Sequence, residues 1–191
     1  MLKILIWPGF ILLLLAQWFV PLQMIWSKNK ILSQGKSYKF ETAPVDPSDP
    51  FMGKYIVLNF KESSLMTTDA KKFSYNGKVY VRFLTGNDGF AKVGSINVTT
   101  PQTDDYLETT ISYISEMKDS SVVFLTYPFT RYYMEEYKAP KAESIYRDRI
   151  KDSTLKTYAL VNIYKGDAVI KDVYINDTLI NDVIKTRDAV R

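Results

Sequence analysis

Residues 4–27 read ILIWPGFILLLLAQWFVPLQMIWS, a stretch that contains no charged side chain. A helix of roughly 20 apolar residues crosses the hydrocarbon core of a bilayer, so this stretch is long enough to span it. Lys3 precedes the stretch and Lys28 follows it, and tryptophans lie toward both ends, as is typical of interfacial aromatic residues. The sequence therefore predicts a transmembrane anchor over residues 1–28 that contacts the lipid bilayer through residues 4–27.

A cleaved signal peptide is an alternative for the same stretch. The apolar region of a signal peptide runs about 7–15 residues, which is shorter than what is found here. Ala16 is followed by Gln-Trp-Phe, and no Ala-x-Ala cleavage pattern is present. A buried helical hairpin is a third alternative. We expect a retained anchor with a kink at Pro21.

The orientation of the anchor follows from two arguments that disagree. The lysines after the stretch, Lys28, Lys30 and Lys36, outnumber Lys3 before it, which favours a cytoplasmic domain by the positive-inside rule. Anchors with a very short leading tail, however, usually export the chain that follows. We expect a single-pass protein of the inner (cytoplasmic) membrane whose domain lies on the extracytoplasmic side.

The composition excludes several classes of function. The chain has 191 residues with no cysteine and no histidine, so Ser-His-Asp and Cys-His catalysis are impossible, and a structural zinc site lacks its usual ligands. The net charge of +4 comes from 25 basic and 21 acidic residues that are dispersed along the chain, which argues against nucleic-acid binding. We expect no cofactor, no metal site and no enzymatic activity.

The chain after the anchor alternates between apolar and polar residues in many short runs. Aromatic and β-branched residues fill these runs, and turn signals such as Asn76-Gly77, Gly86–Gly89 and Lys165-Gly166 separate them. The runs at 55–60 and 122–127 are the most apolar, and we expect central, buried strands there. We also expect a hairpin at Asn76-Gly77 and an edge strand or frayed tail at 179–184.

One helix is predicted in this part of the chain. Pro140 suits an early helical position, and Ala142, Ile145, Tyr146 and Ile150 fall on one stripe at helical spacing. The fold class is therefore mainly β (α+β): a transmembrane helix followed by an antiparallel β-sandwich or partly open barrel with one covering helix. We divide the chain into the anchor, a juxtamembrane strand and Pro-rich loop at 29–50, and a β-rich domain at 51–191.

Three segments resemble the bacterial GDYXXLXY-motif family, named for Gly-Asp-Tyr-x-x-Leu-x-Tyr. In the segment 49–60, Gly53, Tyr55 and Leu58 match the motif, whereas Lys54 replaces its aspartate and Phe60 its last tyrosine. The segments 131–136 (RYYMEE) and 171–176 (KDVYIN) are similar to two further blocks of the family. The resemblance implies a membrane-anchored bacterial envelope protein, often encoded beside multi-pass membrane proteins, and it implies no catalytic residue.

The candidate binding residues come from these three segments. An Arg–Glu pair between Arg131 and Glu135 or Glu136 is a candidate for fixing the helix to the sheet, and the alternative is a guanidinium that grips a ligand. The predicted binding residues are Gly53, Tyr55, Leu58, Arg131, Tyr132, Tyr133 and Glu136. Carboxylates at Asp46, Asp49 and Asp88 are weaker candidates for Ca²⁺, because their spacing matches no calcium-binding loop.

Three classes of function remain. The first is a non-enzymatic accessory protein or binding partner of a multi-pass membrane protein. The second is a hydrolase of the signal-peptidase type, in which Ser63 or Ser64 is activated by Lys71, Lys72 or Lys78. The third is a small-ligand-binding module with an aromatic pocket built from Tyr132 and Tyr133. We expect the first.

Overall fold

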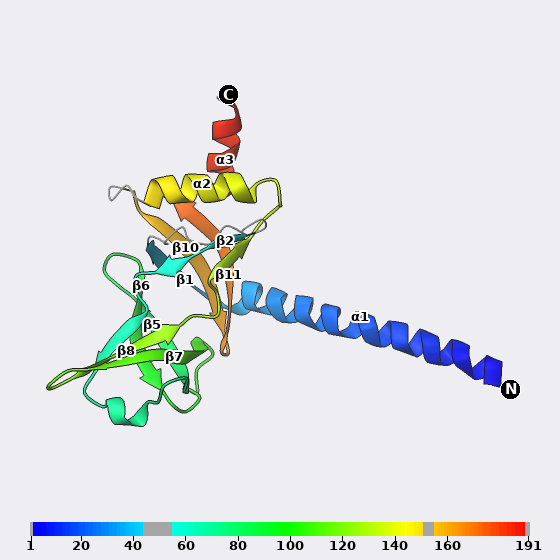
Figure 1. Ribbon diagram of the computed structural model, residues 1–191, viewed down its shortest axis with the longest axis horizontal. Helices are drawn as coiled ribbons and strands as arrows, with labels where there is room; N and C mark the ends of the chain where they lie inside the picture. Colours follow the sequence, from blue (N-terminus) through cyan, green and yellow to red (C-terminus); the bar gives the residue numbers. More distant parts are fainter. Residues whose placement is uncertain (1, 44–54, 151–154, 190–191) are drawn as a thin grey trace.

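The computed structural model describes residues 2–43, 55–150 and 155–189, with the side chains at 2–7, 9, 11, 147, 148, 150 and 187–189 excepted. In this part the protein is mainly β, with twelve strands and three α-helices. Figure 1 shows a body of two β-rich halves, one above the other, from which a long helix projects to one side. The mainly β prediction is confirmed.

The projecting helix is α1, which runs from Leu2 to Gln34 with Pro8 and Pro21 inside it. It leaves the body between the two halves and makes no contact with them over most of its length (Figure 1). The helix therefore continues beyond residue 28 into the polar segment that precedes the first strand. Among the residues whose side chains are described, no helix is both long and apolar enough to cross a membrane.

The junction between α1 and the body is closely packed. Ile31 is buried, and the buried amide of Asn162 donates to the carbonyl oxygens of Leu32 at 3.0 Å and Ile31 at 3.5 Å. The Asn162 amide oxygen accepts the hydroxyl of Ser37 at 2.7 Å. Gly35 is required here because a Cβ would lie 2.4 Å from the Ile31 carbonyl oxygen. A side chain of the body thus donates to carbonyls in the last turn of α1, of which that of Ile31 also accepts the Gly35 amide at 2.9 Å.

The upper half of the body contains a five-stranded antiparallel sheet with the order β12-β11-β10-β1-β3. Helices α2 and α3 pack against each other above it, and α3 also contacts β11 and β12 (Figure 1). The elements of this half are β1 (Lys36–Ala43), β3 (Asn59–Phe60), α2 (Ala139–Ile150), β10 (Thr157–Tyr164), β11 (Asp167–Ile175), β12 (Thr178–Leu179) and α3 (Ile180–Ala189).

The lower half is a second antiparallel sheet with the order β4-β8-β7-β5-β6. The sheet curls until its edge strands β4 and β6 contact each other, which nearly closes a five-stranded barrel. Its elements are β4 (Ser64–Thr67), the 3₁₀ turn η1 (Ala70–Lys72), β5 (Lys78–Thr85), β6 (Ala91–Asn97), β7 (Tyr106–Glu116) and β8 (Ser121–Thr126). This matches the partly open barrel that the strand pattern predicts.

A two-stranded ladder joins the two halves. It pairs β2 (Tyr55–Val57) with β9 (Arg131–Tyr133) in the upper half, while the chain on either side of it continues into β4 and β8 of the lower half. The segment 55–60 therefore differs from the prediction of a single central strand. It divides into β2 and β3, which pair with different strands, because β3 turns toward β1.

Aromatic rings form the centre of the body. Phe40 of β1 is fully buried, and its ring centroid lies 4.9 Å from Phe83, 5.2 Å from Phe129, 5.6 Å from Phe60 and 5.7 Å from Tyr127. These neighbours come from both halves of the body and from the segment between β8 and β9. Edge-to-face pairs of this kind add to the free energy gained by burying the rings. The two halves thus share one core.

The helical prediction after Pro140 is confirmed, since α2 buries Ala142, Ile145 and Tyr146. The prediction of an edge strand or frayed tail at 179–184 is wrong after Leu179, where α3 begins. Ile180 and Ile184 are buried, and their spacing of four residues places them on one helical face. With the partly buried Val183 they form an apolar face of a single turn, which is too short for the sequence pattern to reveal a helix.

The hairpin predicted at Asn76-Gly77 is also absent. Asn76 does adopt a left-handed backbone with φ of 56°, and the Gly77 amide donates to the Ser74 carbonyl at 2.9 Å. The turn, however, follows a short 3₁₀ turn at 70–72 and not a strand, and β5 pairs with β6 and β7 instead. The turns at 86–89 and 165–166 do connect antiparallel neighbours as predicted.

Candidate functional site

The outer face of the β2–β9 ladder presents three of the candidate binding residues. Tyr55 and Tyr133 are directly paired, with ring centroids 5.4 Å apart. The guanidinium of Arg131 lies 5.1 Å from the centre of the Tyr55 ring, a cation–π contact. Tyr133 is 65% exposed. This outer face therefore offers a cation and two phenols to a binding partner.

Tyr132 points to the opposite face and is buried with its pair partner Ile56. Its phenol interacts with Asp172 of β11 and with Asn181 of α3. Burial, together with Asp172, raises the pKa of Tyr132, and burial also raises the pKa of Asp172. Two of the segments that resemble the family, 131–136 and 171–176, thus meet through these side chains.

The Arg–Glu pair that the sequence suggested does not form at Glu135. Glu135 pairs with Lys138 at 2.8 Å, while Arg131 stacks on Tyr55. Glu136 is exposed in the turn before α2. Gly53 lies outside the described residues. Helix α2 packs on the body through its apolar stripe, in which Ala142, Ile145 and Tyr146 are buried.

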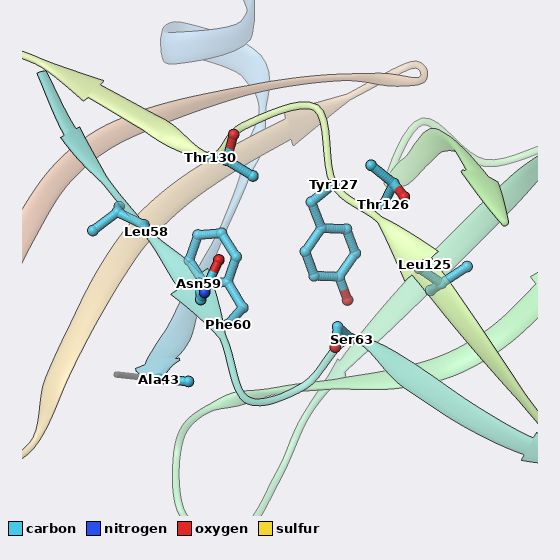
Figure 2. A pocket seen from close by; sticks show the side chains of 9 residues that line it. All are labelled: Ala43, Leu58, Asn59, Phe60, Ser63, Leu125, Thr126, Tyr127 and Thr130. Atoms are coloured by element: carbon cyan, nitrogen blue, oxygen red, sulfur yellow. The ribbon is translucent and has the colours of Figure 1, made fainter. Parts of the chain in front are cut away.

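A cavity of about 440 Å³ opens beside the ladder, between the upper and the lower half (Figure 2). Leu58, a residue of the family motif, lines it together with Phe60, which occupies the position of the motif's last tyrosine. The lining residues are Ala43, Leu58, Asn59, Phe60, Ser63, Leu125, Thr126, Tyr127 and Thr130. We call this cavity the fork pocket, because the two strands that flank it separate there.

The separation lies between two short antiparallel ladders that are formed by the same two chain segments. Val57 pairs with Arg131 on one side of the gap, and Ser64 pairs with Phe124 on the other. The last backbone bonds that flank the gap join Leu58 to Thr130 and Leu125 to Ser63, both at 2.8 Å. The four residues between these bonds on each strand, 59–62 and 126–129, lie outside both registers. The pocket thus lies where the two segments separate between one ladder and the next.

Pro128 explains why the pair opens at this point. If the register of β2 and β9 continued, Phe60 would oppose Pro128, which has no N–H to donate to the ladder. Instead, Phe60 pairs with Thr42 of β1, and the phenol of Tyr127 donates to the Glu62 carbonyl at 2.6 Å across the opening. Burial raises the pKa of Tyr127, so this phenol stays neutral and remains a donor at physiological pH.

The pocket wall combines aromatic rings with uncharged polar groups. Figure 2 shows the rings of Phe60 and Tyr127 between the separated strands, with the side chain of Ser63 near the phenol and that of Thr130 at the opposite end. Asn59 supplies an amide, and no residue of the wall carries a charge. Such a wall fits a neutral ligand that has both apolar and hydrogen-bonding parts.

Sequence patterns identified only part of this pocket. Leu58 is among the predicted binding residues, but Tyr127 and the hydroxyl residues of the wall are not. The aromatic pocket expected from Tyr132 and Tyr133 is wrong in place, because the former is buried against β11 and the latter lies on the outer face. The available signal was Pro128, which directly follows a strongly apolar strand and breaks its ladder.

The residues considered for a Ser/Lys hydrolase are arranged for other roles. Lys72 pairs with Asp69 at 3.0 Å and Lys78 pairs with Glu108 at 2.8 Å. The hydrogen bond to Glu108 raises the pKa of Lys78, whereas a lysine that activates a serine needs a lowered pKa. Ser63 lines the fork pocket, whereas Lys72 and Lys78 form ion pairs with other residues.

Of the three carboxylates considered for Ca²⁺, the structure describes only Asp88. Asp46 and Asp49 lie outside the described residues. The Asp88 carboxylate accepts the Phe90 amide at 3.1 Å and lies 3.6 Å from Lys92, so it stabilises the turn between β5 and β6. No group of three metal-ligating side chains is present among the described residues.

Comparison with known proteins supplies one match. The model of the GDYXXLXY protein family matches residues 17–173, which include the segments 49–60 and 131–136 and the first three residues of the segment 171–176. No curated protein and no solved structure matches the chain. Because the match covers most of the sequence, the chain belongs to the GDYXXLXY protein family.

Proposed function

We propose that the protein is a membrane-anchored bacterial envelope protein without enzymatic activity that binds a multi-pass membrane protein. The observation that carries this proposal is the exposed apolar surface of α1. Large apolar side chains such as Leu15, Trp18 and Trp26 are 67%, 67% and 78% exposed. A helix that is apolar on all sides is normally buried in a protein core or in a membrane. The body leaves this helix uncovered, and a bilayer would cover it.

The dimensions of α1 agree with this proposal. Its 33 residues extend about 50 Å at 1.5 Å per residue, and the hydrocarbon core of a bilayer is about 30 Å thick. The uncharged run at residues 4–27, in which the side chains at 4–7, 9 and 11 are not described, would lie in the hydrocarbon core. The remaining length of α1 would place Lys28 and Lys30 among the head groups.

The partner class is supported by two amides within the apolar run. Gln17 and Gln23 have exposed side chains on α1. The hydrocarbon core of a bilayer contains no hydrogen-bonding group, so it would supply neither amide with a partner. Amide side chains in membranes form hydrogen bonds across helices. A protein with several transmembrane helices would offer both the apolar surface and these hydrogen bonds. The outer face of the β2–β9 ladder would provide a further contact outside the bilayer.

We further propose that the body lies on the extracytoplasmic side of the cytoplasmic membrane. Protease accessibility tests this directly. A protease added to spheroplasts is expected to degrade the body, while the body in sealed inverted vesicles is expected to resist. The opposite pattern would place the body in the cytoplasm and refute the exported orientation.

Cross-linking in intact cells tests the partner class. The full chain is cross-linked, solubilised in mild detergent and purified in parallel with a variant in which Gln17 and Gln23 are replaced by leucine. We expect a multi-pass membrane protein to be recovered with the natural chain and to be depleted with the variant. Recovery of the chain as a monomer, or equal recovery of the same protein with both chains, would contradict the proposal.

A further inference from the structure

The orientation of the Phe60 backbone gives the fork pocket a hydrogen-bonding edge. Phe60 and Thr42 are partners in the β1–β3 ladder, and the adjacent bond runs from the Lys61 amide to the Glu41 carbonyl at 3.0 Å. This arrangement makes Phe60:Thr42 a non-hydrogen-bonded pair of the antiparallel ladder. The N–H and C=O of Phe60 therefore point away from β1 and toward the opening, where Pro128 cannot complete the pair.

An open strand edge of this kind is what extended peptides recognise. Peptides that add to a strand edge obtain affinity from main-chain hydrogen bonds and specificity from a pocket for a side chain. The fork pocket places both features together, since the opened edge at Phe60 adjoins a cavity of about 440 Å³. That volume accommodates one large side chain with its peptide group, and it is too small for a helix.

The wall of the pocket restricts which side chain can enter. Leu58 and Leu125 are buried apolar residues of the wall, and Tyr127 presents an aromatic ring, so an apolar or aromatic group is favoured. A charged side chain would lose its hydration without meeting an opposite charge. The hydroxyls and the amide of the wall are suited to the neutral peptide group.

We propose that the fork pocket binds an extended, uncharged peptide segment of the partner protein and takes up one of its aromatic side chains. The inference rests on the proposed partner-binding function, because it names the site at which that partner is held. The peptide group bonds to the opened edge at Phe60, and the aromatic ring packs against Tyr127. The surface used is thus distinct from the membrane contact of α1.

The test uses the full chain in detergent micelles with ¹³C-labelled leucine methyl groups. The probe is N-acetyl-phenylalanine methylamide, which carries one aromatic ring between two neutral amides. We expect saturable shifts of the Leu58 and Leu125 methyl signals. The corresponding glycine, lysine and glutamate methylamides are expected to bind at least about tenfold more weakly, because they lack the ring or carry a charge.

Two blocking variants and one matched control define the site. Ser63→Trp fills the pocket from one strand and Thr130→Trp from the other, so both are expected to abolish the shifts. Ser115→Trp changes a serine of similar exposure at the far end of β7 and is expected to leave the shifts unchanged. Any shift that the probe causes by entering the micelle would also occur in this control, so it can be distinguished from binding in the pocket.

Several results would overturn the inference. These are no localised shift at saturating probe, equal shifts in folded blocking variants, or equal binding of neutral and charged probes. If neither blocking variant folds, the comparison of the four probes on the natural chain still decides. Membrane association of the natural chain is measured separately. Failure of the chain to associate with membranes would refute the anchored function, whereas failure to bind the probe would refute only this inference.

Discussion

Helix α1 and the aromatic centre of the body are the two most apolar regions of the protein, and they differ in what surrounds them. The Phe40 ring is fully buried among four other rings, whereas Trp26 in α1 is 78% exposed. Burying a large apolar side chain stabilises a protein by about 1.5–3 kcal/mol relative to leaving it exposed. The body obtains this stabilisation from its own chain, and α1 requires another environment to obtain it.

The strongest way to break this contrast is to place charges in α1. Replacing Leu13 and Leu14 together by arginine is expected to release the chain from membranes, because each arginine costs about 2.5–3.5 kcal/mol at the centre of a membrane helix. Flotation of the chain with lipid vesicles measures the loss, and the unfolding temperature of the body is expected to stay unchanged.

The matched control places two arginines on the body. Leu84 and Val98 are 61% and 48% exposed there, and their replacement is expected to leave flotation unaffected. If the α1 variant floated as efficiently as the natural chain, the apolar surface of α1 would not be what attaches the protein to the bilayer.

The second change is made in the aromatic core of the body and leaves α1 unaltered. Phe40→Ala is expected to lower the free energy of unfolding of the body by about 3–5 kcal/mol, because it leaves a cavity at the centre of the ring cluster. Urea denaturation followed by circular dichroism measures this effect, while flotation with vesicles is expected to persist. Phe124→Ala, at a residue that is 36% exposed, should cost much less. Equal losses for the two variants would contradict the shared aromatic core.

The third change addresses the junction between the two regions. Asn162→Ala leaves the Ile31 and Leu32 carbonyls without their side-chain donor, which is expected to cost about 1–3 kcal/mol. Hydrogen exchange of the body measures this loss, and the Gly35 amide is expected to exchange faster. Asn97→Ala serves as the control on a surface strand. An unchanged Gly35 exchange rate in Asn162→Ala would show that α1 is held without this contact.

The smallest expected effect concerns pH. Burial raises the pKa of Asp172 in the folded protein above its ordinary value of 3.8. Its contribution to stability is thus fully present below that value and is lost as pH rises through the folded pKa. Asp172→Asn is therefore expected to raise the unfolding temperature at pH 7, and this gain should vanish below about pH 4. A gain that was constant across this pH range, or equal to that of the exposed Asp167→Asn, would contradict the assignment.

The sequence predicted those elements whose signal is local. The apolar stripe of α2 at Ala142, Ile145 and Tyr146 and the turn at 165–166 are both visible in neighbouring residues. Helix α3 was missed because its described apolar face is short, with Ile180 and Ile184 buried and Val183 partly buried, and that contact depends on tertiary packing. Local patterns therefore predict an element well when it carries its own apolar face.

The fork pocket could not have been predicted in the same way. It depends on the pairing of two segments about 70 residues apart and on the turn of Phe60 toward β1. Pro128 signals a break in one strand, but it does not reveal which residue opposes it. The family motif identified Leu58 because it marks one side of this pair, and the other side carries no comparable pattern.

Tryptophan fluorescence tests the central claim most directly, because the three tryptophans of the chain, Trp7, Trp18 and Trp26, all belong to α1. The emission therefore reports on this helix alone, without a signal from the body. The full chain is reconstituted in vesicles whose acyl chains carry bromine, and the quenching is compared with that by acrylamide in the water phase. A helix buried in the bilayer gives blue-shifted emission that brominated chains quench and acrylamide does not. Emission typical of water, quenched by acrylamide and insensitive to the brominated chains, would contradict the account.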